Sequence, residues 1–394
     1  MTDMQKTNMI YLDNSATTPL CEDARREMLA AMECFGNPSS LHSVGYEAHK
    51  LLDAARKSVA TSMGLRSYKN EQIVFTSCGS EAASLAIFGS VFAKARKVGQ
   101  RILTTDCEHP AVEMAMKRLE AHGFEVMRIP TKGGVLDLDV LKNALDKPIQ
   151  LASFMMVNNE TGARFEVEKA FALVKEKYPD ATTHTDAVQG FLKESFNISQ
   201  LGADMVSVSA HKIHGPKGVG ALYVSPDVIK KRNLVPFLVG GGQEGGLRSG
   251  TENMIGICGF GAAAEEGIAT LASDLEHMRT LRDAAAQKLS DMGLKINLPQ
   301  GRRAPHILSV TLPNIKSETM LHFLSSVGVC VSSGSACSSH SKTQSQSLLA
   351  FGLTPAEADS TIRISFSRFN TAEDVDSLVA AVERGLMMLV RIKR

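Results

Sequence analysis

A lysine stands between an apolar run and a glycine-rich turn at residues 209–220, Ser-Ala-His-Lys-Ile-His-Gly-Pro-Lys-Gly-Val-Gly. This lysine, Lys212, follows a predicted buried strand, which places it at the rim of a cleft. Poor hydration and neighbouring cations favour the neutral amine, the form of a lysine that attacks a carbonyl carbon. The position favours a lysine that forms a Schiff base, although His214 and Lys217 leave open a surface lysine in a basic turn.

A second candidate for chemistry is Cys337, which lies in a serine-rich segment. Eight of the 16 residues from 332 to 347 are serine and none is a large apolar residue, so the segment predicts a mobile loop. A thiolate on such a loop has the reach and exposure to attack a sulfur atom and carry it outward. His109 is a candidate to assist its deprotonation and His340 is another. Cys330, in contrast, lies in an apolar run that predicts a buried, inert thiol.

Asp186 is the third candidate, within Thr-Thr-His-Thr-Asp-Ala-Val-Gln-Gly at residues 182–190. An aspartate after a strand is often the N-cap of a helix. A carboxylate at a strand end can also keep the nitrogen of a pyridine ring protonated, which a ring that acts as an electron sink requires. Asp186 precedes Lys212 by 26 residues and forms an Asp-x-x-Gln pattern with Gln189, and the family resemblance described next favours this second role.

These segments resemble those of pyridoxal 5'-phosphate (PLP) enzymes of the class-V aminotransferase family. Residues 209–220 resemble the segment of the PLP-binding lysine, and Ser-Ser-Gly-Ser-Ala-Cys at 332–337 resembles the loop of NifS/IscS-type cysteine desulfurases. The resemblance covers nearly the whole chain, including residues 11–19 and 36–42. It implies fold type I, with PLP on Lys212 and L-cysteine as substrate. It further implies L-alanine as product and a persulfide on Cys337, passed to a sulfur-acceptor protein such as an iron–sulfur scaffold.

The resemblance also implies roles around the cofactor ring and the substrate. Asp186 would contact the ring nitrogen, and Gln189 would lie near the ring oxygen. His109, in segment 106–112, would lie over the ring and shuttle protons, although a solvated loop histidine is the alternative. Asn159, within Asn-Asn-Glu-Thr-Gly, would lie near the ring oxygen and the substrate. Arg363, within Ile-Arg-Ile-Ser, would clamp the α-carboxylate through its planar fork.

A phosphate group needs backbone N–H groups at the start of a helix. Residues 75–81 predict a strand, a turn of small residues and a helix, although Cys78 stands where relatives carry glycine. Segment 240–253 resembles the one through which one subunit completes its partner's site, which implies a homodimer. The residues that the resemblance places at the phosphate are Gly79, Ser80, Ser209, His211 and Thr251.

Apolar, β-rich runs alternate with segments of helical length, and this predicts an α/β fold with a mostly parallel, seven-stranded sheet. Ligands of such sheets bind beyond the carboxyl ends of the strands, where the candidates above are placed. The expected strands are 72–75, 101–105, 126–129, 151–157, 182–185, 205–208 and 221–224.

The chain is expected to form two packed domains. Residues 15–260 would form the large PLP-binding domain, and residues 261–394 with 1–14 a smaller α+β domain that carries the cysteine loop. An apolar stripe from Leu275 to Met292 predicts a long amphipathic helix between them. A final helix is expected after Thr371, with Asp374 completing a capping box.

Composition limits the partners and the compartment. With 43 basic and 42 acidic residues, the chain offers no bulk electrostatic case for nucleic acid or for an anionic membrane. Its N-terminus lacks a signal core, and no stretch is expected to reach the roughly 18 apolar residues of a spanning helix. Seven cysteines, an odd number, favour reduced thiols and a cytoplasmic protein. The cysteines expected to be structural, besides Cys330, are Cys21, Cys34, Cys107 and Cys258.

Three alternatives to a cysteine desulfurase remain at this stage. A selenocysteine lyase or another class-V PLP aminotransferase would use the same cofactor residues, but neither explains a signature thiol on a mobile loop. A non-enzymatic sulfur-trafficking module would not need both Lys212 and Asp186. No metal is expected in the site.

Overall fold

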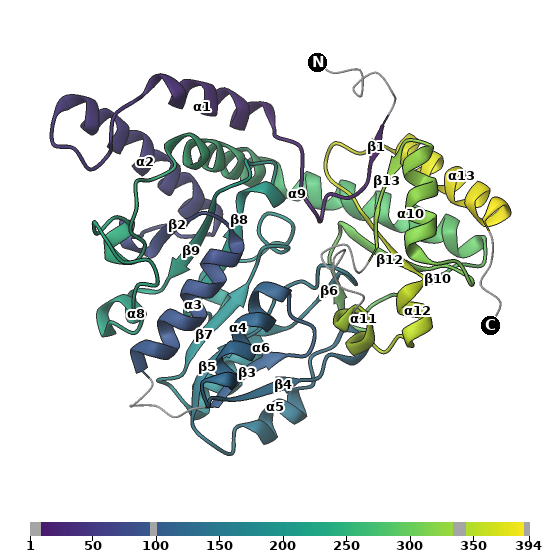
Figure 1. Cartoon of the computed structure of the whole chain (residues 1–394), viewed down its shortest axis with the longest axis horizontal. Helices are drawn as coiled ribbons and strands as arrows, with labels where there is room; N and C mark the ends of the chain where they lie inside the picture. The colour runs from purple at the N-terminus through teal and green to yellow at the C-terminus, as the bar shows by residue number, and fades with distance from the viewer. Residues whose placement is uncertain (1–8, 95–100, 334–343, 390–394) are drawn as a thin grey trace.

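The computed structural model describes residues 9–94, 101–333 and 344–389 (Figure 1). They form a larger lobe around a seven-stranded sheet and a smaller lobe around a four-stranded sheet. One long helix, α9 (Met254–Asp291), runs through both lobes. Near the N-terminus, strand β1 (Ile10–Tyr11) pairs in parallel with β13 (Val329–Cys330), so this part of the chain belongs structurally to the smaller lobe.

The sheet of the larger lobe has the strand order β2-β9-β8-β7-β5-β3-β4. Strand β9 is antiparallel to both of its neighbours, and the remaining pairs are parallel. The predicted α/β fold with a mostly parallel, seven-stranded sheet is therefore confirmed. The strands are Ile73–Thr76 (β2), Arg101–Thr105 (β3), Glu125–Ile129 (β4), Ile149–Ser153 (β5), Thr182–Asp186 (β7), Met205–Ser209 (β8) and Gly220–Val224 (β9).

Helices cover both faces of this sheet, because successive residues of a strand point to opposite faces. In β3, Ile102 packs in the core formed with α3 and α4, whereas the next residue, Leu103, packs in the core formed with α2, α6 and α9. The other helices of the larger lobe lie around these layers (Figure 1). The helices of this lobe besides α9 are Glu22–Glu33 (α1), Ser43–Ser62 (α2), Gly79–Lys94 (α3), Pro110–Ala121 (α4), Leu138–Ala144 (α5), Val167–Lys177 (α6), Ile198–Leu201 (α7) and Pro226–Lys231 (α8).

The smaller lobe has an antiparallel sheet of order β10-β12-β15-β14, backed by helices. Its core joins Leu12 of the N-terminal segment to Ile364 of β15 and Leu378 of α13. Thr371 and Asp374 form the predicted capping box at the start of α13. A separate antiparallel pair of short strands, Ala163–Arg164 (β6) and Arg302–Arg303 (β11), joins the two lobes. The elements of the smaller lobe are Lys295–Ile296 (β10), Ile307–Thr311 (β12), Ser332–Ser333 (β14), Thr361–Ser365 (β15), Ser317–Ser326 (α10), Gln346–Phe351 (α11), Pro355–Asp359 (α12) and Ala372–Met388 (α13).

Helix α9 corrects one expectation, because by length and composition alone it is apolar enough to cross a membrane. It is the one helix among the described residues that meets this test. Phe260 lies in the core of the larger lobe and Leu281 in that of the smaller lobe, so α9 packs as the core helix of two lobes. The proposed domain boundary at residues 260 and 261 falls inside this helix and stays a prediction.

Two local expectations are also wrong. Strand β5 ends at Ser153 instead of residue 157, because the chain leaves its parallel partner β3 there. The backbone N–H groups of Phe154 and Met156 still donate to carbonyl oxygens of β7, which keeps this stretch buried and extended. Cys330, expected to be buried, is half-buried at the edge between β13 and β1.

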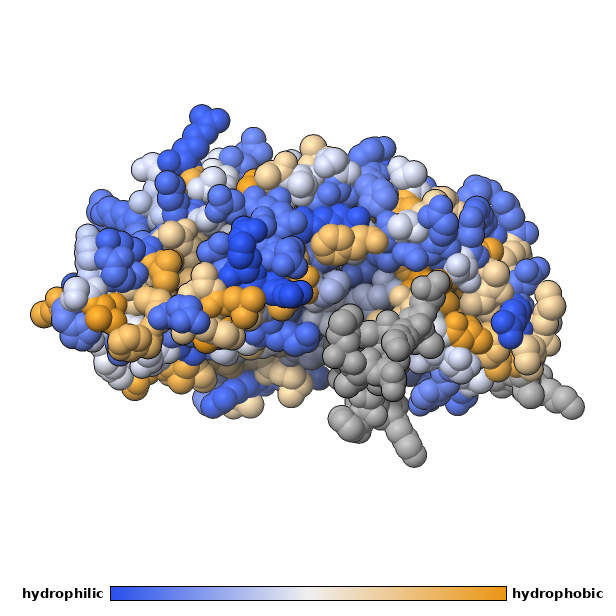
Figure 2. Space-filling view, turned by 90° about the horizontal axis from the view of Figure 1, so that it is seen from above, coloured by the Kyte–Doolittle hydropathy of each residue, from blue (hydrophilic) through white to orange (hydrophobic). Residues whose placement is uncertain are grey.

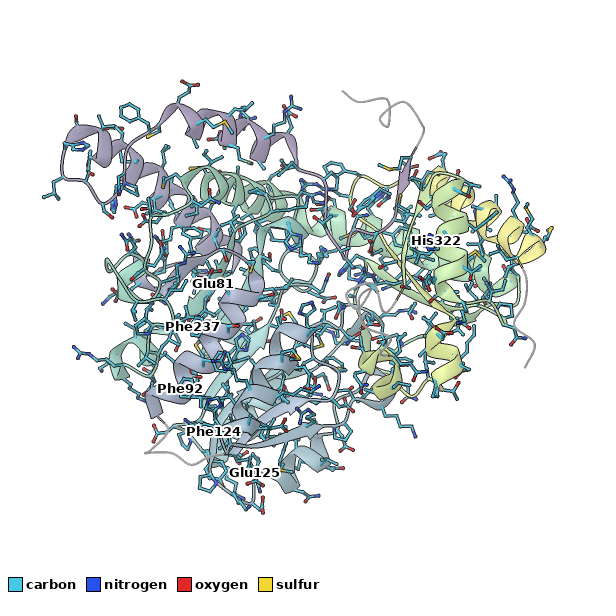
Figure 3. The ribbon with its side chains drawn as sticks, viewed as in Figure 1. Glu81, Phe92, Phe124, Glu125, Phe237 and His322 are labelled. Atoms are coloured by element: carbon cyan, nitrogen blue, oxygen red, sulfur yellow. The ribbon has the colours of Figure 1, made fainter. Side chains whose placement is uncertain are left out.

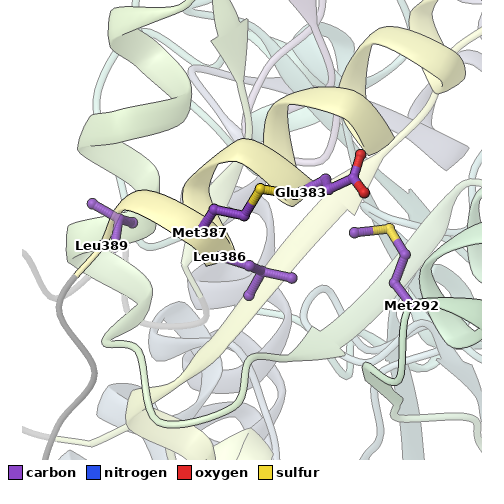
Figure 4. Close-up of a pocket in the computed structure, with 5 residues that line it drawn as sticks. All are labelled: Met292, Glu383, Leu386, Met387 and Leu389. Carbon is purple, nitrogen blue, oxygen red and sulfur yellow. The ribbon is translucent and has the colours of Figure 1, made fainter.

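The smaller lobe carries a surface groove between α13 and the end of α9 (Figure 4). Four of its five lining side chains are apolar and the fifth is Glu383. None of them is a candidate for chemistry, so the groove does not compete with the strand ends of the larger lobe as the reactive site. The lining residues are Met292, Glu383, Leu386, Met387 and Leu389.

Candidate active site

Lys212 lies at the carboxyl end of β8, in the single 3₁₀ turn Ala210–Lys212. Every residue of β8 is buried, so the turn begins at a fixed point of the sheet edge. The Lys212 Nζ donates hydrogen bonds to the backbone oxygens of Ser15 and Ala16, both at 2.7 Å. The predicted strand end is therefore present, and an N-terminal segment from the other lobe contacts the lysine.

Asp186 ends β7, the strand next to β8, and its side chain is 8% exposed. Its Oδ1 accepts from the backbone N–H of Val188 at 2.9 Å. Burial raises the pKa of Asp186, while His109 and Lys212 act in the opposite direction. An aspartate in this environment stays ionised only beside positive charge, which a protonated ring nitrogen would supply.

His109 is the N-cap of α4 and follows β3, another strand of the parallel set. Its Nδ1 accepts from the backbone N–H of Ala111 at 3.1 Å, which leaves Nε2 as the protonated nitrogen of the neutral ring. Burial lowers the pKa of His109, Asp186 raises it, and Lys212 and Arg363 lower it further. Asp186, Lys212 and Arg363 are therefore near enough to His109 for their charges to act on its imidazole ring.

Arg363 approaches the same space from β15 of the smaller lobe and is 5% exposed. Its Nη1 donates to the backbone oxygen of Asn159 at 2.9 Å, and its Nη2 donates to Asp13 Oδ1 at 2.8 Å. Gln189 donates from Nε2 to the backbone oxygen of Ser15 at 2.9 Å. The structure thus brings the predicted ring and substrate residues together, with both lobes contributing.

The turn between β2 and α3 has the geometry of a phosphate cradle. A Cβ atom on Gly79 would lie 2.8 Å from Val188 Cγ2 and 3.3 Å from Ser209 Cβ, so the helix start presses against the end of β8. The Ser209 Oγ is buried and has no hydrogen-bond partner among the described residues. A donor of this kind beside the first N–H groups of a 16-residue helix fits a phosphate oxygen.

Other residues predicted at the phosphate are less enclosed. His211 Nδ1 lies 3.2 Å from Thr17 Oγ1, and burial lowers the pKa of His211 to about 4. Ser80 is exposed on the first turn of α3, and Thr251 is exposed within segment 240–253. Cys78 is half-buried, and the turn accommodates its side chain beside Ser77, with Sγ 3.8 Å from the serine Oγ.

Several site residues carried no signal that sequence reasoning recognised. Glu108 is buried beside His109, and burial raises its pKa to about 8. Lys193 lines a small cavity with Lys212, and burial lowers its pKa well below its usual range. Asp13 lies in segment 11–19, which carries part of the family resemblance, but no local pattern shows its pairing with Arg363, 350 residues away. Cys337 and His340 lie outside the residues that the structure describes.

Residues 10–378 match the family described as Aminotransferase class-V. The chain belongs to the class-V aminotransferase family. This class-V chain is 38% identical over 385 residues to "Cysteine desulfurase IscS" of Dictyoglomus turgidum. The aligned residues cover 95% of the chain and 94% of the relative. It is 36% identical over 382 residues to "Cysteine desulfurase NifS" of Azotobacter vinelandii, covering 95% and 91%.

Solved structures agree with this family assignment. A "NIFS-like protein" has a TM-score of 0.89 and 36% identity to the class-V chain, covering 97% of the chain and 100% of the relative. A second structure, "SspA in complex with cysteine", has a TM-score of 0.77 and 31% identity, covering 92% and 99%. The predicted resemblance to NifS/IscS-type proteins and the predicted fold type are confirmed.

PLP is the cofactor of this family, and the residues present fit it. When bound, PLP supplies an electron sink that stabilises negative charge at the α-carbon of an amino acid. The turn at Gly79 with Ser209 and His211 would hold the phosphate, and Asp186 would hold the proton of the ring nitrogen. The cofactor's phosphate would explain why the Ser209 Oγ has no hydrogen-bond partner within the described part of the chain.

Proposed function

We propose that this class-V enzyme is a cysteine desulfurase that converts L-cysteine to L-alanine and leaves the sulfur as a persulfide on Cys337. Relatives named cysteine desulfurase, and a solved relative in complex with cysteine, support the proposal. The change balances without a further reactant, because a thiol and L-cysteine together contain the atoms of a persulfide and L-alanine. The two sulfur atoms are oxidised as they bond, and the β-carbon, which exchanges sulfur for hydrogen, is reduced.

The observation that carries the proposal is the convergence of two cations and two proton carriers on one space. Arg363 presents donors suited to an α-carboxylate, and Lys212 reaches the sheet edge where the α-carbon would lie. In this assignment Lys212 removes the α-proton, Asp186 keeps the ring nitrogen protonated, and His109 exchanges protons with the substrate. Asn159 and Gln189 complete the surroundings of the ring oxygen.

The role of Cys337 rests on the sequence signature and on the anchors beside its segment. Strand β14 places Ser332 opposite Arg363, so the chain leaves the described region next to the substrate arginine. After the gap, Ser345 Oγ donates to Glu160 Oε2 at 2.6 Å, one residue from Asn159. The described residues on both sides of the Cys337 segment therefore lie beside the proposed position of the substrate, which supports attack of this thiol on the substrate sulfur.

A homodimer is part of the proposal, because exposed apolar side chains gather on the larger lobe. Phe35 is 88% exposed after α1, and apolar side chains are visible over this end of the molecule (Figure 2). Phe92 and Phe237, which are labelled in Figure 3, are both about half exposed. Each of them stacks on Phe88. In the dimer, Thr251 of each subunit would reach the phosphate of its partner's cofactor, which agrees with its exposure here.

The persulfide is proposed to pass to a sulfur-acceptor protein that serves iron–sulfur cluster assembly, as the IscS and NifS names of the relatives suggest.

The compartment proposed is the cytoplasm. All six cysteines of the described residues are free thiols, which is typical of a reducing compartment. Burial raises the pKa of Cys107 to about 12, so this thiol is suited to packing and not to sulfur transfer.

The test is to incubate the PLP-loaded enzyme with L-cysteine and to quantify L-alanine together with the persulfide, located by mass spectrometry. Lys212→Ala should yield neither product, and Cys337→Ser should lose the persulfide. Cys330→Ser is the matched control and should keep both products. L-alanine production by Cys337→Ser at the parental rate would refute the assignment and favour a lyase or an aminotransferase.

A further inference from the structure

The guanidinium group of Arg363 is already paired with a carboxylate of the chain itself. Asp13 Oδ1 accepts from Nη2 at 2.8 Å, and the two side chains are 20% and 6% exposed. The Asp13 contact uses one oxygen and one nitrogen, so it is not the two-point fork of a fully engaged arginine. Arg363 Nε is buried and has no hydrogen-bond partner among the described residues, so donors of the guanidinium remain for a second acceptor.

Asp13 is held at this position by its backbone. It forms a parallel bridge with Ser365, two residues along β15 from Arg363. The next residues extend this attachment, because the backbone N–H of Ser15 donates to Ser365 Oγ at 2.8 Å. The Asp13 carboxylate therefore stays at a high effective concentration beside Arg363.

We propose that Asp13 sets the affinity of the site for amino acids, because its carboxylate shares Arg363 with the α-carboxylate of the ligand. The inference rests on the proposed function, in which Arg363 binds that α-carboxylate. A ligand carboxylate at Arg363 meets a cation that is already neutralised, and it must displace Asp13 or lie near a like charge. Both routes weaken binding relative to a free arginine, for the substrate and for the product, L-alanine.

This arrangement has a consequence for turnover. Substrate and product carry the same α-carboxylate, so an unopposed, buried arginine would retain L-alanine as firmly as it captures L-cysteine. A resident carboxylate lowers the affinity for both ligands, and it re-forms its ion pair when the product leaves. Release of L-alanine is therefore faster than it would be from an unpaired arginine.

The test uses Asp13→Asn, which removes the charge but keeps a side-chain oxygen that can accept from Arg363. Binding to the PLP-loaded enzyme is measured by calorimetry with L-alanine and with propionate, which has the carboxylate but no amine. Both ligands should bind roughly threefold to tenfold more tightly to the variant, the range expected for a partly exposed ion pair. L-alaninamide, which lacks the carboxylate, should bind parent and variant equally.

Two further variants separate the possible failures. Asp23→Asn removes a surface charge on α1 and should leave all three affinities unchanged. Arg363→Ala should weaken propionate binding in the otherwise parental enzyme; if it does not, the proposed role of Arg363 fails. The inference about Asp13 is wrong if Arg363→Ala weakens propionate binding but Asp13→Asn does not strengthen the binding of propionate and L-alanine. Thermal unfolding of each variant shows whether its fold is intact.

Discussion

The buried carboxyl group of Glu108 should make the folded protein less stable as the pH rises from about 5 to 8. Burial raises the pKa of Glu108 to about 8, against a usual value near 4.5. Between these values the folded state keeps a proton that the unfolded state has lost, so the free energy of unfolding falls with rising pH. At 1.36 kcal/mol per pKa unit, the full loss is on the order of 5 kcal/mol.

Glu108→Gln tests this prediction, because glutamine does not titrate. Its amide oxygen can still accept from the backbone N–H of Met155 and from Thr105 Oγ1, which both lie 2.8 Å from Glu108 Oε1. Urea unfolding at fixed protein and PLP concentrations should give similar stabilities near pH 5. At pH 8.5 the variant should be more stable by roughly 2–4 kcal/mol. Parallel stability curves for parent and variant from pH 5 to 8.5 would refute the reasoning.

Three further predictions concern the surroundings of the cofactor. Glu244→Ala leaves the guanidinium of Arg56, which is 6% exposed, without its buried carboxylate partner. The free energy of unfolding, measured with urea, should fall by about 3–5 kcal/mol. A fall below about 1 kcal/mol would contradict a buried ion pair. Gly220→Ala would place a Cβ atom 2.6 Å from the carbonyl carbon of Cys78 and so displace the turn before α3. The affinity for PLP, measured by fluorescence titration, should therefore fall at least tenfold. An unchanged affinity would mean that this turn does not hold the phosphate. Asp186→Asn should retain PLP but slow exchange of the α-proton of L-alanine with deuterated water, followed by NMR, whereas parental exchange would reject its role.

The sheet was predictable because six of its seven strands, all but the edge strand β4, are buried on both faces. Such strands appear in the sequence as continuous apolar or β-branched runs, and the expected start of each of the seven strands lies within two residues of the observed one. Helix α9 was harder. Its apolar stripe begins only at Leu275, whereas its first turns contain small residues such as Gly256 and Gly261 that are buried without any periodic pattern. A helix buried all round gives no amphipathic signal.

The side chains at strand ends were predictable for the same reason, and the contacts across the lobes were not. Lys212 and Asp186 follow recognisable strands, so their common edge could be inferred. The groups that hold Lys212 are the backbone oxygens of Ser15 and Ala16, and a backbone oxygen leaves no mark in the sequence. The ion pair of Asp13 with Arg363 joins positions 350 residues apart, which no local pattern can reveal.

The short N-terminal segment explains why the site suits an α-amino acid. Asp13 contacts Arg363, and Ser15 and Ala16 contact Lys212, so one stretch of four residues touches both side chains. An extended chain advances at most about 3.6 Å per residue, so the Cα atoms of Asp13 and Ala16 lie within roughly 11 Å of each other. The α-carboxylate and α-proton of an amino acid are attached to the same carbon, so a ligand with widely separated groups would not reach both Arg363 and Lys212. The arginine comes from the smaller lobe and the lysine from the larger, so the relative position of the lobes sets this spacing.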